Sequence, residues 1–82
     1  MKLPRDLDGR KLASLLHRYD YQITRQTGSH IRLTSTVRGT EHRVTVPAHK
    51  EIRVGTLPTI LRDVAGYLEI DQAQLLDALF GG

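Results

Sequence analysis

Apolar residues near the start of the chain recur at helical spacing. Leu12, Leu15, Leu16 and Tyr19 lie three or four residues apart, which is typical of a helix that buries one face. Asp8 stands where an N-cap is expected, and Leu7 and Leu12 occupy the two positions of a hydrophobic staple. The pattern predicts a first helix that begins just after Asp8.

After Asp20 the period of the pattern changes to two, which is typical of strands with one buried face. Three alternating runs follow, and the breaks between them, 27–29 and 38–41, are short enough for antiparallel hairpins. Pro47 ends the third run because it has no N–H to donate to a ladder. The side chains expected on one apolar face are Tyr21, Ile23, Ile31, Leu33, Ser35, Val37, Val44 and Val46.

Two further helices are predicted in the last third of the chain. Thr56 is a plausible N-cap, Pro58 is tolerated in a first turn, and an apolar stripe then runs to Gly66. Asp71 and Gln74 have the spacing of a capping box for a short third helix. The two apolar stripes are Leu57, Ile60, Leu61 and Val64, and then Leu75, Leu76, Leu79 and Phe80.

The predicted order is therefore α-β-β-β-α-α. Three antiparallel strands need a cover for their apolar face, and the helices supply the available apolar surfaces. We expect an α+β two-layer sandwich with the helices on one face of the sheet. The opposite face should be open, with Arg32 and Arg43 on it and His30 at its rim.

Length and composition limit the possible function classes. A chain of 82 residues has room for one domain, which we place at residues 1–82. The absence of cysteine excludes disulfides, thiolate zinc sites and cysteine nucleophiles. No window approaches the roughly 20 apolar residues of a membrane span, and the N-terminus lacks the apolar stretch of a signal peptide. We expect a cytoplasmic protein that makes no membrane contact.

Charge is distributed unevenly along the chain. All twelve Lys and Arg residues lie within residues 1–62, together with five of the nine acids, whereas residues 63–82 contain acids and no base. The basic part is the expected face for a polyanion. Scattered solubilising charges are the alternative explanation.

Among the four histidines, His30 has the most suggestive setting. It follows a Gly-Ser turn at the start of a strand, and alternation with Ile31 directs its ring away from the core. An exposed imidazole flanked by Arg25, Arg32 and Arg43 is a candidate for proton transfer to or from a bound phosphodiester. An exposed histidine without a catalytic role is the alternative.

The other histidines are weaker candidates. We expect His17 to be a surface residue and His42 to pack at the sheet edge. His49 lies beside Lys50 in a loop and is either a second acid–base group or a partner of Glu51. The histidines do not cluster at ligand spacing, so we predict no metal site and no cofactor.

Three motifs in order resemble the HicA family of mRNA interferase toxins. They are Gly28-Ser29-His30 at a strand start, Val44-Thr45-Val46-Pro47 with His49 just beyond, and Gly55-Thr56-Leu57 at a helix start. The resemblance covers nearly the whole chain. It departs from the family pattern at Pro58, where a polar or basic residue is more common, and at Tyr19-Asp20-Tyr21, where a glycine is common.

The resemblance implies a fold like the double-stranded RNA-binding domain and a metal-independent endoribonuclease activity on mRNA. It also implies neutralisation by a HicB-like antitoxin, and it assigns the catalytic role to His30, as general acid or as general base. The residues expected to bind RNA are Gly28, Ser29, Arg25, Arg32, Arg43, His49 and Lys50. We expect a monomer when the chain is free and a hetero-oligomer with the antitoxin.

Two other functions remain open from the sequence. A non-catalytic RNA-binding module would use the same basic surface and the same fold. A protein-interaction domain would use that surface to dock an acidic partner.

Overall fold

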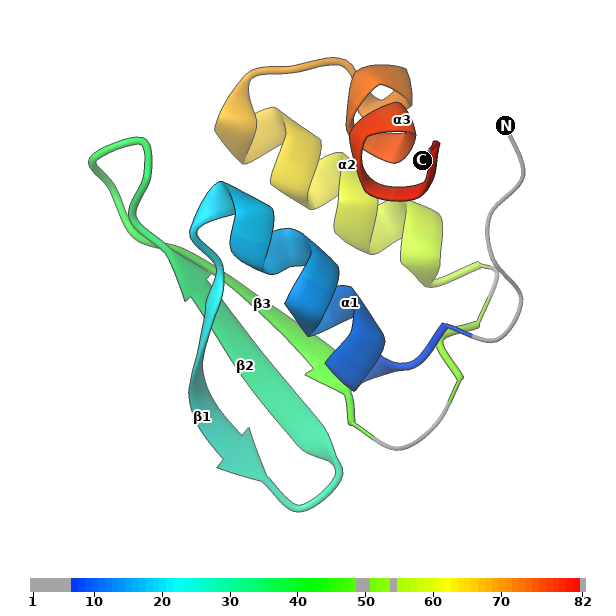
Figure 1. Cartoon of the computed structure of the whole chain (residues 1–82). Helices are drawn as coiled ribbons and strands as arrows, with labels where there is room; N and C mark the ends of the chain where they lie inside the picture. Colours follow the sequence, from blue (N-terminus) through cyan, green and yellow to red (C-terminus); the bar gives the residue numbers. More distant parts are fainter. Residues whose placement is uncertain (1–6, 49–50, 54, 82) are drawn as a thin grey trace.

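The structure is a computed structural model that describes residues 7–48, 51–53 and 55–81. Its helices and strands follow the predicted order (Figure 1). They are α1 (Gly9–Leu16), a short 3-10 helix η1 (His17–Tyr19), β1 (Gln22–Thr27), β2 (His30–Ser35), β3 (His42–Pro47), α2 (Leu57–Leu68) and α3 (Gln72–Phe80).

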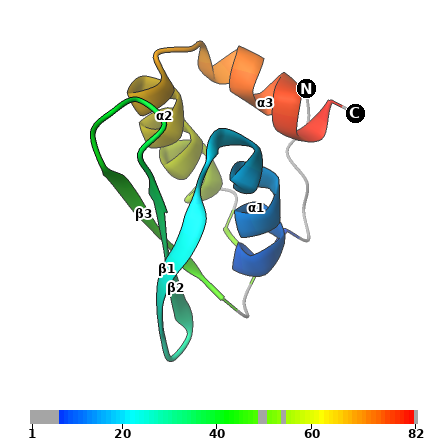
Figure 2. The same cartoon turned by 60° about the vertical axis from the view of Figure 1, so that its left-hand side comes forward.

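The three strands form one antiparallel sheet in the order β1-β2-β3. Helices α1 and α2 cover one face of this sheet, and α3 packs on α2 at the side farthest from the sheet (Figures 1 and 2). The other face of the sheet carries no element of the described chain. The predicted α+β class, with the helices on one face, is confirmed.

The core lies between the sheet and the helices. Alternate residues of β2 and β3 are buried, as the period of two predicts. They meet the apolar stripes of α1 and α2, and Leu75 and Leu79 of α3 complete the same cluster. The main contributors from the sheet and the first two helices are Ile31, Leu33, Val44, Val46, Leu12, Leu16, Leu61 and Val64.

The start of α1 is held close to the end of β3. The side chain of Asp8 accepts a hydrogen bond from the backbone N–H of Lys11 at 2.8 Å, which is the predicted N-cap. Gly9 follows at the first helical position, where a Cβ atom would lie 1.8 Å from the carbonyl oxygen of Pro47. The glycine is therefore required by a close approach between two backbones.

The second hairpin differs from the prediction at Val37, which was expected on the apolar face. The strand ends at Ser35, whose buried hydroxyl donates to the carbonyl of Tyr19 at 2.9 Å and accepts from the N–H of Val37 at 3.3 Å. The chain turns there, and Val37 is 53% exposed. A side-chain hydrogen bond to the local backbone thus ends the strand before the alternation in the sequence does.

Helix α2 also differs from the prediction, because it continues through Gly66 to Leu68. Glu69 is the C-cap of this helix and takes the left-handed conformation with φ of 59°. Leu68 is buried and Tyr67 packs against the core. Their packing outweighs the cost of about 1 kcal/mol for a glycine inside a helix. Thr56 and Asp71 precede α2 and α3, but neither side chain makes a capping hydrogen bond.

Candidate functional site

His30 lies on the open face of the sheet, in a hollow of about 320 Å³. The ring is exposed, in agreement with the predicted outward direction. The residues that line the hollow are Arg25, Thr27, His30, Arg32 and Thr45, so all three strands contribute.

The strand register arranges these residues in two rows. In the first row, His30 pairs with Thr27 of β1 and with Pro47 of β3. In the second row, Arg32 pairs with Arg25 of β1 and with Thr45 of β3. Since residues two apart on a strand point to the same face, the second row lies beside the first on the open face.

A β-bulge brings Arg25 into this hollow. The register shifts by one residue between Ile23 and Arg25, which makes Thr24 the extra residue of β1. Simple alternation would place Arg25 on the same face as Ile23, the face that the helices cover. After the bulge Arg25 stands opposite Arg32, and the hydroxyls of Thr24 and Thr34 meet at 2.8 Å on the open face.

Arg25 and Arg32 form a like-charged pair directly across two strands. Such pairs destabilise a sheet, because side chains that face each other have Cβ atoms only about 5 Å apart. Neither guanidinium makes an ion pair within the described part of the chain. The hollow beside His30 therefore concentrates positive charge that a bound anion would offset.

The remaining predicted site residues have different surroundings. Arg43 lies on the open face opposite Thr34, outside the lining of the hollow, and its Nε bonds to Glu41 at 2.6 Å. The hydrogen bond and charge of Glu41 raise the pKa of the Arg43 guanidinium.

The turn before His30 is tied to the end of β3. Gly28 has φ of 54°, a left-handed conformation that favours glycine, and the carbonyl of Ser29 accepts the N–H of Ala48 at 2.6 Å. This bond anchors the hairpin at the position where His30 begins its strand. His49 and Lys50, which follow Ala48, lie outside the described residues.

Sequence reasoning missed two residues of the hollow, Thr27 and Thr45. Thr45 alternates with Val44 and Val46, so the period of two already directed it to the open face. Thr27 carried no such signal, because the break between the strands was assigned to residues 27–29. Its place opposite His30 depends on the length of β1.

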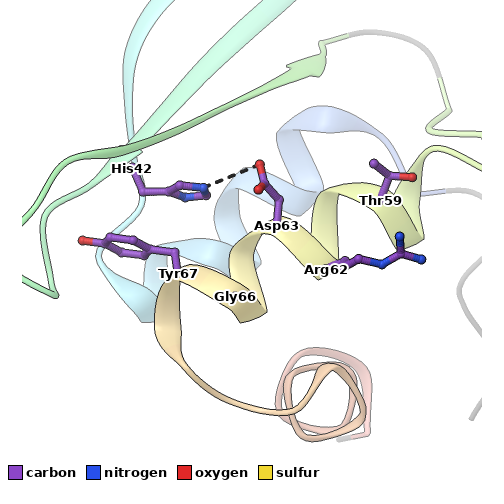
Figure 3. Close-up of a pocket in the computed structure, with 6 residues that line it drawn as sticks. All are labelled: His42, Thr59, Arg62, Asp63, Gly66 and Tyr67. Atoms are coloured by element: carbon purple, nitrogen blue, oxygen red, sulfur yellow. Dashed lines mark ion pairs between the residues drawn. The ribbon is translucent and has the colours of Figure 1, made fainter.

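A second pocket, of about 570 Å³, lies between the start of β3 and α2 (Figure 3). The rings of His42 and Tyr67 stack at 4.7 Å, and the Nε2 atom of His42 faces Asp63 at 3.5 Å. The Nδ1 atom of His42 lies 2.6 Å from the hydroxyl of Tyr21. Both nitrogens of His42 are thus occupied, Nε2 by a contact with α2 and Nδ1 by a contact with the residue before β1, which confirms that this histidine packs at the sheet edge.

Tyr21 is almost fully buried beneath this pocket. Burial, with smaller contributions from Tyr67 and Asp63, raises the pKa of the Tyr21 hydroxyl well above its ordinary value. The hydroxyl is therefore neutral at physiological pH and shares a hydrogen bond with Nδ1 of His42. Tyr21 and His42 hold the two layers together here.

No group of three or more histidine, aspartate or glutamate side chains in residues 7–48, 51–53 and 55–81 is arranged to hold a metal ion. No helix within these ranges is long and apolar enough to cross a membrane.

The fold and the open face together define a small α+β domain with a basic, histidine-containing sheet surface. A family model described as the HicA toxin of bacterial toxin–antitoxin systems matches residues 9–65, from the start of α1 into α2. The chain therefore belongs to the HicA toxin family. No curated protein and no solved structure matches the chain.

Proposed function

We propose that this toxin is an endoribonuclease that cleaves mRNA in the cytoplasm, with residues 1–82 acting as one domain and with no metal cofactor. The observation that supports this proposal most strongly is the facing pair of Arg25 and Arg32 beside the exposed ring of His30. Two like charges without a carboxylate partner in the described chain form a poor structural pair. They are well suited to bind a phosphodiester anion.

In the proposed reaction, the 2′-hydroxyl of the RNA attacks the adjacent phosphorus. The new P–O2′ bond forms as the P–O5′ bond breaks, leaving a 2′,3′-cyclic phosphate and a free 5′-hydroxyl. His30 takes the proton from the 2′-hydroxyl or gives one to the departing 5′-oxygen. Arg25 and Arg32 contact the non-bridging oxygens and contribute to the rate to the extent that these contacts strengthen in the transition state.

The test compares His30→Ala with His17→Ala, because both histidines are exposed and only His30 lies in the hollow. With a labelled RNA oligonucleotide and EDTA present, His30→Ala should lower the cleavage rate by about 10²- to 10⁴-fold, the usual contribution of one acid–base group. RNA affinity should change only a few-fold, and His17→Ala should retain both properties. Cleavage by His30→Ala at the wild-type rate would contradict the assignment.

A non-catalytic RNA-binding module is the second candidate. It is favoured by one observation: His30 is the one side chain suited to proton transfer among the described residues that line the hollow. The wild-type protein distinguishes the two candidates, because a binder yields no 2′,3′-cyclic phosphate product during long incubation with RNA. A nuclease yields this product, and its His30→Ala variant does not.

A further inference from the structure

We propose that the outer edge of β1, with the groove between β1 and α1, is the docking site for an acidic, extended segment of the antitoxin. The family supplies the existence of an antitoxin partner. The surface and the chemistry of the segment come from the observations below. The proposal does not depend on the ribonuclease activity.

Strand β1 offers an accessible sheet edge. It is the first strand in the order β1-β2-β3, so one side of its backbone has no neighbouring strand in the sheet. All six of its residues are exposed. The opposite edge, β3, alternates with buried residues and ends in Pro47, which lacks an N–H. An added strand therefore pairs more readily with β1.

A groove runs beside this edge on the side of the sheet that faces the helices. It has a volume of about 290 Å³ and is lined by Arg10, Ala13, Ser14, His17, Tyr21 and Ile23. Ile23 pairs with the buried Leu33, yet it lines this groove and is 50% exposed. An apolar side chain of an added strand would complete the cover of Ile23.

The charges around β1 favour an acidic polypeptide. Arg10 borders the groove and Arg25 lies on the other face of the strand. Among residues 7–48, 51–53 and 55–81, no acidic side chain lines the groove. Alternate side chains of an added strand point to opposite faces, so an apolar residue fits against Ile23 while its acidic neighbours approach Arg25.

Two other occupants fit less well. A second copy of this chain paired through β1 would bring two Arg25 side chains onto one face, which like-charge repulsion opposes. RNA would satisfy Arg10 and Arg25, but it has neither main-chain amides for the strand edge nor an aliphatic side chain for the contact with Ile23.

The test measures the affinity of the full chain for its antitoxin. Ile23→Asp is compared with Val37→Asp, since Val37 is exposed to a similar extent, 53%, at the distant β2–β3 turn. Ile23→Asp should weaken the complex at least about tenfold, and Val37→Asp should change it less than about twofold. In hydrogen exchange, the β1 amides should gain protection in the complex.

A second pair of variants tests the charge requirement without changing an apolar residue. Arg10→Glu and Lys11→Glu alter the net charge equally on neighbouring positions of α1, and only Arg10 lines the groove. Arg10→Glu should weaken antitoxin binding at least about fivefold more than Lys11→Glu. Thermal melts establish that each variant is folded, and the Arg10 pair still tests the proposal if Ile23→Asp is unstable.

Three results would overturn the proposal. The first is an equal effect of the groove variants and their controls on antitoxin affinity. The second is a loss of RNA affinity with Ile23→Asp as large as its loss of antitoxin affinity, which would assign the groove to RNA. The third is a wild-type dimer that Ile23→Asp converts to monomer. Loss of RNA cleavage is not part of this test, so the two proposals fail separately.

Discussion

Replacing Gly9 by alanine should destabilise the fold even though alanine is the better helix former. The added Cβ atom would lie 1.8 Å from the carbonyl oxygen and 2.7 Å from the carbonyl carbon of Pro47, and 3.1 Å from Cγ2 of Val46. Two of the three contacts are with backbone atoms. The start of α1 or the end of β3 must therefore move by at least about 1.2 Å for the closest contact to reach 3.0 Å.

The expected magnitude follows from the kind of contact that is strained. Overpacking of this type costs about 1–3 kcal/mol, and the helix propensity of alanine offsets less than about 1 kcal/mol of it. For a domain of this size, each 1 kcal/mol changes Tm by about 4–8 °C, so a net cost of about 0.5–2.5 kcal/mol should lower Tm by roughly 2–20 °C. Because Pro47 pairs with His30, the NMR signals of His30 should shift as well.

Gly66→Ala is the matched control, since Gly66 also lies in a helix but, in the described part of the chain, no other element comes within 4 Å of an added Cβ. This variant should gain about 0.5–1 kcal/mol from helix propensity. Urea and thermal denaturation followed by circular dichroism measure both variants. If Gly9→Ala melts at or above the wild-type temperature, α1 does not press on the end of β3 as described.

Three further predictions concern the charged and aromatic groups. Arg32→Ala should raise the free energy of unfolding by about 0.2–1 kcal/mol, because it removes the repulsion from Arg25. It should also reduce the salt dependence of RNA binding by about one phosphate contact. Lower stability together with unchanged salt dependence would contradict this. Because burial raises the pKa of Tyr21, the stability that its neutral form provides is complete below about pH 10, the ordinary pKa of tyrosine, and decreases as the pH rises above it. Denaturation between pH 8 and 12 should show this decrease, and Tyr21→Phe should reduce it. Tyr67→Phe should destabilise the β2–β3 turn by about 1–2 kcal/mol, because the Tyr67 hydroxyl accepts the N–H of Arg38 at 3.0 Å and donates to a carbonyl of the same turn. Hydrogen exchange at the Arg38 amide should become faster. Unchanged exchange would show that the turn does not depend on the Tyr67 hydroxyl.

The periodicity of the sequence determined the two layers and the direction of most side chains. Alternation in β2 alone places Ile31 and Leu33 inward and His30 and Arg32 outward, because the direction of a side chain in a regular strand depends only on its parity. The helices likewise followed from apolar residues three and four apart. These features are local, and a sequence records them directly.

Of the three arginines expected beside His30, the tertiary structure brings Arg25 and Arg32 to the hollow and leaves Arg43 outside it. Alternation from Tyr21 and Ile23 would assign Arg25 to the apolar face, and only the pairing of β1 with β2 reveals the bulge that reverses it. Arg43 shares the open face but is held by Glu41 outside the hollow. Strand register depends on contacts between segments that are distant along the chain, so no local pattern specified it.

Close approaches between elements could also not be predicted from the sequence. By helix propensity alone glycine is unfavourable at position 9, and only the fold shows that the carbonyl of Pro47 lies against it. The sequence by itself determined the order of elements and the outward direction of His30, because periodicity along a chain is a local property. Only the packed structure decided that Arg25 faces Arg32 and that Gly9 admits no side chain, because both depend on distances across the fold.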